Sequence, residues 1–193
     1  MTHNNDTDKK IDLIAGHINE ILKLLGEDTA REGLLKTPRR AAKALWYITD
    51  GYRQDPGQLM RQAVFAHEGS QMVVVRNIEF YSMCEHHILP FFGHVSIGYV
   101  PDGKIVGLSK LARLVNLYAR RLQVQERLTR QICHDITAEL GAKGTIVMCH
   151  AEHLCMKMRG VETQDSKTTT IEYDGIFADD PGLRSQFLAM IKE

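Results

Sequence analysis

The chain has 193 residues, of which 44% are hydrophobic and 25% are charged, and its 24 lysines and arginines balance 24 aspartates and glutamates. A chain of this length forms one domain, or one domain with a helical extension, that buries its own core. The neutral balance argues against a nucleic-acid partner, which would favour a basic excess. No apolar run approaches the ~18 residues of a membrane span, and the polar start MTHNNDTDKK lacks the apolar core of a signal peptide. We therefore expect a cytoplasmic protein with neither nucleic-acid nor membrane partners.

The first third of the chain has the pattern of helices. Apolar residues recur at every third or fourth position from Ile11, which predicts an amphipathic helix. Thr37 and Pro38 provide an N-cap and a first-turn proline for a second helix that runs to about Asp50. The regions that we predict are a disordered tail over 1–8, a helical region over 9–57 and a folded domain over 58–193.

The remaining pattern is one of strands that flank a pair of helices. Residues 71–82 alternate between apolar and polar side chains, which predicts a strand. The later predicted elements are a strand over 93–100, helices over 109–121 and 124–140, strands over 145–158 and 167–173, and a last helix over 181–192. This ββααββ order predicts an α+β fold with an antiparallel sheet rather than a parallel βαβ array.

Metal-binding residues concentrate at two places in the sequence. Four cysteines, expected to be reduced, accompany nine histidines, and Cys84 and His87 are close enough for one tight turn to present both to an ion. A third ligand would come from His153 or Cys155. A set of two cysteines and one histidine is typical of catalytic zinc that keeps a fourth position for water. A closed structural zinc site, or cysteines that are merely buried, remain alternatives.

The predicted strand over 145–158 suggests how the second segment would be arranged. Residues two apart in a strand share a face, so His153, Cys155, Lys157 and Arg159 are expected to project from one side. That face would combine an acid/base group, a metal ligand and two cations. The alternative is an exposed strand face whose cations are solvated.

Basic residues open two predicted helices, where the helix dipole disfavours them. Arg40 and Lys43 follow Thr37, and Lys110 and Arg113 follow Ser109. A helix N-terminus with added cations is suited to a phosphate group, although each set could be ordinary surface charge. The sequence contains neither the GxxxxGK[ST] nor the GxGxxG motif, so a P-loop and a Rossmann turn are both excluded.

Glu126 follows Gln125 near the start of the helix predicted over 124–140. A carboxylate there could accept the paired N1–H and N2–H₂ donors of guanine. The favourable interaction of an acidic residue with a helix N-terminus is the alternative explanation.

From about Asp28 onward the chain resembles the GTP cyclohydrolase I family. The Cys-Glu-His-His run, the downstream His-x-Cys and the run Gln-Val-Gln-Glu-Arg-Leu-Thr are specific when taken together. The matching segments are 31–38, 82–87, 107–110, 123–129 and 153–160. The resemblance implies the tunnelling fold, a homodecamer with active sites at subunit interfaces, and GTP as substrate. It implies hydrolysis at guanine C8, release of formate and reclosure to 7,8-dihydroneopterin triphosphate, the first step of tetrahydrofolate and pterin biosynthesis.

The resemblance also implies roles for individual residues of the domain over 58–193, which would be catalytic. Cys84, His87 and Cys155 match the ligands of zinc, one ion per subunit. His86 and His153 match the catalytic acid/base pair. Gln125 and Glu126 match positions that contact ribose and guanine. The positions that match the triphosphate contacts are Arg40, Lys43, Ser109, Lys110, Arg113 and Arg159.

Two other functions fit parts of the sequence. A structural zinc-binding or assembly module would use the same ligands without chemistry, and it would unfold when the metal is removed. A nitrile reductase of the same superfold would need a free nucleophilic cysteine and a nicotinamide donor. Both candidate cysteines fall at zinc positions instead, which favours the cyclohydrolase.

Overall fold

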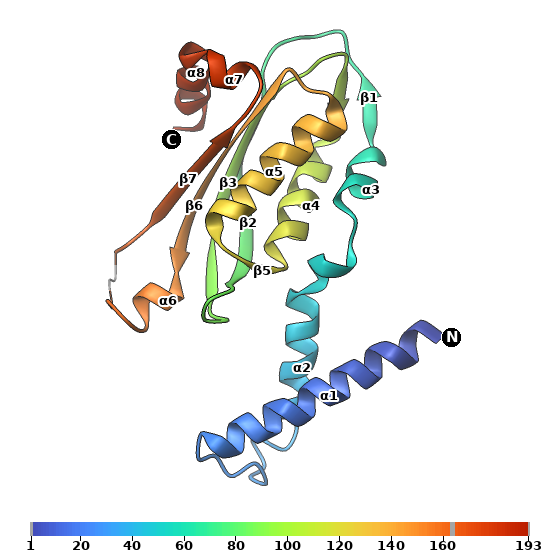
Figure 1. The fold of residues 1–193 in the computed structure, drawn as a ribbon, viewed down its shortest axis with the longest axis vertical. Helices are drawn as coiled ribbons and strands as arrows, with labels where there is room; N and C mark the ends of the chain where they lie inside the picture. The colour runs from blue at the N-terminus through green and yellow to red at the C-terminus, as the bar shows by residue number, and fades with distance from the viewer. Residues whose placement is uncertain (1, 163–164, 193) are drawn as a thin grey trace. The chain divides into compact units, whose positions relative to one another are not determined.

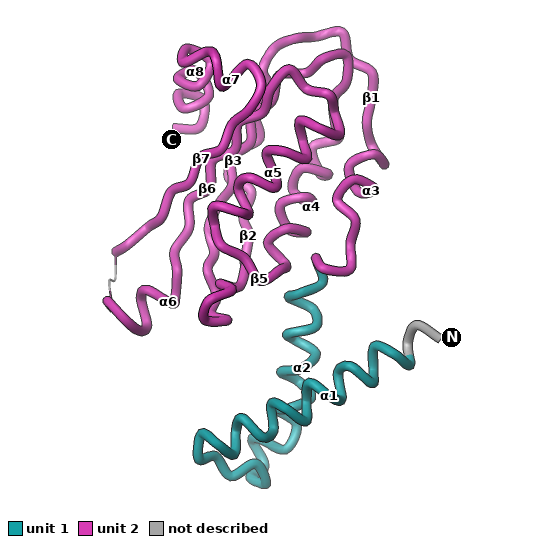
Figure 2. The backbone as a smooth tube through the Cα atoms, in the orientation of Figure 1, with its two compact units in different colours: residues 1–50 teal, residues 51–193 magenta. Residues whose placement is uncertain are grey.

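A computed structural model describes residues 2–162 and 165–192 and divides the chain into two compact units, one up to Asp50 and one from Gly51 (Figure 2). The sequence predicts this boundary after residue 57. The chain from Gly51 belongs to the second unit because the Gly51 amide donates to the Arg120 carbonyl at 2.9 Å and Arg121 Nε donates to the Gly51 carbonyl at 3.0 Å.

The first unit consists of two helices that pack on each other, α1 (Thr2–Leu24) and α2 (Thr37–Ile48). The disordered tail expected over 1–8 is wrong for residues 2–8, which are helical; Met1 lies outside the described residues. Polar contacts extend the helix beyond its apolar stripe. Asp6 pairs with Lys10 at 2.7 Å, one turn away, and Arg39 of α2 reaches Asp8 at 3.6 Å.

The second unit contains a five-stranded sheet in the order β5-β2-β3-β6-β7. β2 (Val73–Cys84), β3 (Pro90–Val100), β6 (Gly144–His153) and β7 (Thr168–Tyr173) pair antiparallel, and β5 (Leu122–Gln123) joins β2 in parallel. Helices α4 (Leu108–Ala119) and α5 (Gln125–Leu140) cover one face (Figure 1). The predicted ββααββ order is therefore the observed one.

The 3-10 helix η1 (Asp50–Arg53) begins at the last residue of the first unit and continues into the second. The other elements of the second unit are α3 (Pro56–Arg61), a two-stranded sheet of β1 (Val64–Ala66) and β4 (Lys104–Val106), α6 (Leu154–Lys157), α7 (Ile176–Asp179) and α8 (Pro181–Ile191). Among the described residues, no helix combines the length and apolarity that a bilayer crossing requires.

The core lies between the sheet and the two long helices. Phe80 and Val95 from the strands and Leu114 and Ile132 from the helices are fully buried there. Gly93 of β3 allows a close approach to β6, since a Cβ at this position would lie 1.9 Å from the His150 carbonyl oxygen. The register places Phe91 opposite His153 and Cys84 opposite Gln123, so the chemically interesting residues gather at one end of the sheet.

The observed strand β6 ends earlier than the strand that the sequence pattern predicts over 145–158. β6 ends at His153, and residues 154–157 form the helical turn α6. The pairing with β3 stops at Phe91 and His153 because β3 begins at Pro90, which has no N–H to continue the ladder. The expected shared face of His153, Cys155, Lys157 and Arg159 is therefore wrong.

Candidate metal centre

Cys84 and His87 come from the turn that connects β2 to β3. Cys84 is the last residue of β2 and is 6% exposed. The turn is closed by the Ile88 amide, which donates to the Cys84 carbonyl at 2.8 Å, and by the Cys84 amide, which donates to the Leu89 carbonyl at 2.9 Å. This tight closure presents the exposed His87 side chain beside the sulfur of Cys84.

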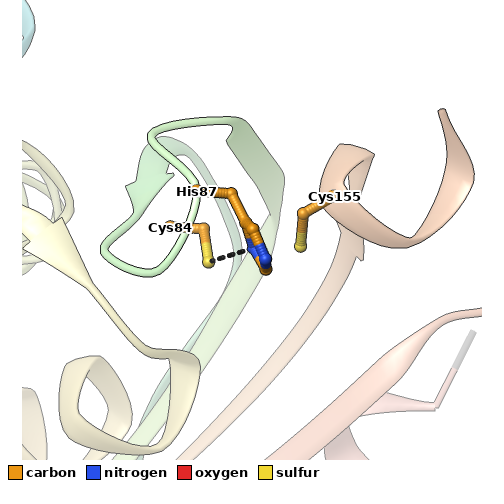
Figure 3. A group of neighbouring side chains, drawn as sticks. All are labelled: Cys84, His87 and Cys155. Carbon is orange, nitrogen blue, oxygen red and sulfur yellow. Dashed lines mark hydrogen bonds between the residues drawn. The ribbon is translucent and has the colours of Figure 1, made fainter. Parts of the chain in front are cut away.

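Cys155 completes the cluster from α6. The ligand atoms of Cys84, His87 and Cys155 all lie within 4.8 Å of one another, and the three side chains point toward one another (Figure 3). Cys84 Sγ and His87 Nδ1 are 3.9 Å apart. A tetrahedral zinc ion with Zn–S bonds of about 2.3 Å and Zn–N bonds of about 2.0 Å would hold ligand atoms roughly 3.5–3.8 Å apart. Small side-chain movements would therefore let these three residues hold such an ion.

The electrostatics of the cluster favour a cation. Burial raises the pKa of the Cys155 thiol, and the nearby Cys84 raises this pKa further. Two adjacent thiolates repel each other unless a positive charge lies between them. A divalent ion reverses this effect, because it binds the thiolate form.

His86 and Glu85 lie next to the metal ligands. His86 is exposed, and its Nδ1 lies 4.0 Å from Cys84 Sγ. Glu85 forms an ion pair with Arg127 of α5, and its amide donates to the Gln123 carbonyl at 3.0 Å. These contacts attach the turn that carries Cys84 and His87 to β5 and α5.

His153, the last residue of β6, is held in a defined orientation. Its ring stacks on that of Phe91 with centroids 4.7 Å apart and planes 1° from parallel. Its Nε2 lies 2.8 Å from Oε1 of Gln125. Burial lowers the pKa of His153, and the charge of Glu126 opposes this effect in part. A histidine with a lowered pKa is mostly neutral at pH 7 and can accept a proton.

Gln125 and Glu126 begin α5 but have different surroundings. Glu126 is exposed, whereas Gln125 is 2% exposed and uses its amide in hydrogen bonds within the protein. The ribose contact expected of Gln125 stays a prediction. Phe91 and the partners of Gln125 are not apparent from the sequence, because strand pairing brings them to the site and no local motif marks them.

The predicted phosphate contacts occupy several places. Ser109, Arg113 and Arg159 are exposed, and Arg113 lines a cavity of about 340 Å³ with Asn116. Lys110 is 7% exposed and donates to Gln62 Oε1 at 2.7 Å.

Arg40 and Lys43 are exposed side chains of the first unit, where they line a groove with Leu35, Lys36 and Arg39. Lys157, from the expected strand face, instead pairs with Glu152.

The N-cap expected at Thr37 is wrong by one position. Lys36 caps α2 and Gly107 caps α4, neither through a side-chain hydrogen bond. Thr37 is the first residue of α2, and its hydroxyl donates to the Gly33 carbonyl at 3.2 Å instead of capping the helix amides. Pro38 does occupy the first turn, as predicted.

An α+β sheet that gathers two cysteines and a histidine able to hold a metal ion, with a second, half-buried histidine at the same end, defines a class of protein with a candidate catalytic metal centre. The family model described as GTP cyclohydrolase I matches residues 14–192. "GTP cyclohydrolase 1" of Alkalilimnicola ehrlichii is 53% identical over 172 residues, which cover 89% of this chain and 93% of the relative. "GTP cyclohydrolase 1" of Parabacteroides distasonis is 49% identical over 190 residues, 98% of this chain and 96% of the relative. The chain belongs to the GTP cyclohydrolase I family, and the tunnelling fold expected from the resemblance is confirmed.

Proposed function

We propose that this chain hydrolyses GTP at C8 of guanine, releases formate and forms 7,8-dihydroneopterin triphosphate, the first step of tetrahydrofolate and pterin biosynthesis. Family membership over residues 14–192 supports GTP as the substrate. The observation that carries the proposal is the cluster of Cys84, His87 and Cys155, whose ligand atoms lie within 4.8 Å of one another.

The metal is zinc, one ion per subunit, held by these three side chains. When bound, zinc supplies Lewis acidity and a water whose pKa falls to about 7. The Cys₂His set supports this assignment because it leaves a fourth position open, as in other catalytic zinc sites.

The remaining chemistry belongs to side chains of the protein. His153 protonates the imidazole-ring nitrogen of guanine during C8 hydrolysis, and its half-buried, stacked position beside Gln125 supports this role. His86 serves later proton transfers, including opening of the ribose. Glu126 accepts the N1–H and N2–H₂ donors of guanine and so orients C8 toward the metal.

Basic and hydroxyl side chains bind the triphosphate. They are Arg40, Lys43, Ser109, Lys110, Arg113 and Arg159. The enzyme works in the cytoplasm as a homodecamer with its sites at subunit interfaces. The family resemblance supports the assembly and the phosphate contacts.

The test incubates the purified, zinc-loaded chain with GTP and measures formate and the fluorescence of the oxidised pterin. The wild-type chain should produce both, and His153→Ala should release no formate. His134→Ala is a matched control, because this histidine has a side chain that is 76% exposed. Formate release by His153→Ala at the wild-type rate would contradict the role of His153, and no pterin from the wild type would contradict the activity.

A further inference from the structure

The side-chain amide of Gln125 has an orientation that its surroundings determine. Its Nε2 lies 3.0 Å from the Cys149 carbonyl oxygen, 3.1 Å from the Thr168 carbonyl oxygen and 3.2 Å from Thr170 Oγ1. Backbone carbonyl oxygens only accept hydrogen bonds, so the atom that faces them must be the NH₂ group. The amide oxygen is therefore the atom that faces His153.

This orientation determines which nitrogen of His153 carries hydrogen. Gln125 Oε1 lies 2.8 Å from His153 Nε2, and an amide oxygen only accepts. A hydrogen bond at this distance therefore requires Nε2–H. Within residues 2–162 and 165–192, no hydrogen bond reaches Nδ1 of His153, so this nitrogen keeps its lone pair when the ring is neutral.

Neighbouring hydroxyl groups support the same arrangement. Thr129 Oγ1 donates to the Gln125 carbonyl at 2.8 Å, so its own oxygen accepts from Thr170 Oγ1 at 2.6 Å. Thr170 then remains an acceptor for Gln125 Nε2, whose two hydrogens are shared among this hydroxyl oxygen and the two backbone carbonyls. Gln125 and Thr129 are 2% and 1% exposed, so water does not compete with these bonds.

We propose that Gln125 is a positioning residue that holds His153 as the Nε2–H tautomer and presents Nδ1 to the substrate. Phe91 fixes the plane of the ring by stacking, and Gln125 fixes the rotation of the ring within that plane. The part of this inference that concerns the substrate rests on the proposed function. The part that concerns the tautomer does not.

Gln125→Met tests the inference by removing the acceptor while keeping a side chain of similar length. Histidine labelled with ¹⁵N reports the tautomer by NMR in the zinc-loaded, substrate-free protein at about pH 9, where imidazoles with an ordinary pKa of ~6.5 are neutral. His153→Gln assigns the signal. We expect the Nε2–H form in the wild type and a mixture of tautomers in Gln125→Met. An Nδ1–H form in the wild type, or an unchanged tautomer in Gln125→Met, would overturn the proposal.

Thr170→Val provides a milder variant in case Gln125→Met does not fold. It removes one acceptor of the Gln125 amide and leaves both backbone carbonyls, so we expect a smaller change in the same direction. Thr169→Val is the matched control, because the Thr169 hydroxyl contacts His150 at 2.6 Å rather than Gln125. An identical tautomer signal in Thr170→Val and Thr169→Val would contradict the role of the Thr170 hydroxyl in orienting the Gln125 amide.

Kinetics separate positioning from a direct substrate contact. Gln125→Met should lower kcat for GTP about 10- to 100-fold, as loss of a supporting hydrogen bond at a metal site does, and should leave KM within about threefold. A raised KM with an unchanged kcat would instead show that Gln125 binds ribose. Absence of GTP turnover in the wild type would refute the proposed function, and the tautomer measurement would still decide the role of Gln125.

Discussion

Gly93→Ala is expected to destabilise the protein strongly, because β3 and β6 approach each other closely at this residue. The added Cβ would lie 1.9 Å from the His150 carbonyl oxygen and 2.8 Å from Ala151 Cα. Carbon and oxygen normally stay at least about 3.3 Å apart between strands, so the backbones must separate by roughly 1.4 Å. A movement of this size stretches neighbouring N–H···O bonds beyond about 3.5 Å, where they no longer count as hydrogen bonds.

Two lost ladder bonds at about 1 kcal/mol each, with about 1–3 kcal/mol for overpacking, predict a loss of about 3–5 kcal/mol. Unfolding in urea measures it, and with m near 2.5 kcal/mol/M the midpoint should fall by about 1.5 M. The control is Gly107→Ala, whose Cβ would meet its nearest atom at 3.5 Å and should cost less than about 1 kcal/mol. A change within about 1 kcal/mol of wild type in Gly93→Ala would refute this reasoning. Catalysis should fall too, since Phe91 and His153 pair two residues along the same ladder.

Three further predictions concern the metal centre and the core. Cys155→Ser should lower the zinc content well below one ion per chain by elemental analysis, whereas the control Cys133→Ala should retain it. Arg127→Gln should accelerate zinc removal by a chelator, because Glu85 then loses the partner that ties its turn to α5. Burial raises the pKa of Cys149 from 9.0 to about 12. Its thiol therefore stabilises the fold below pH 9, and this contribution is lost as the pH rises toward 12. Relative to Cys149→Ala, the free energy of unfolding should fall by up to about 1.4 kcal/mol per pH unit in that window, and a parallel pH dependence of the two proteins would contradict the assignment.

The local sequence predicted most elements, and it marked Cys84 and His87 as candidate metal ligands with a third to come from His153 or Cys155; the structure clusters Cys155 with the first two. Alternating and helical periodicities are local properties, and they predicted the ββααββ order that the sheet displays. The turn that presents Cys84 and His87 is also local, since both residues lie within one connection between adjacent strands. These features could be predicted because each depends on neighbours along the chain.

Other features depend on partners that are distant in sequence, so only the tertiary structure decided them. The alternating pattern after His153 would continue a strand, but β6 ends there because its partner strand begins at Pro90. Gln125 could have pointed to solvent; the carbonyls of Cys149 and Thr168 turn its amide toward His153. A hydrogen bond forms only between groups that the fold brings within about 3 Å, and sequence periodicity does not specify that distance.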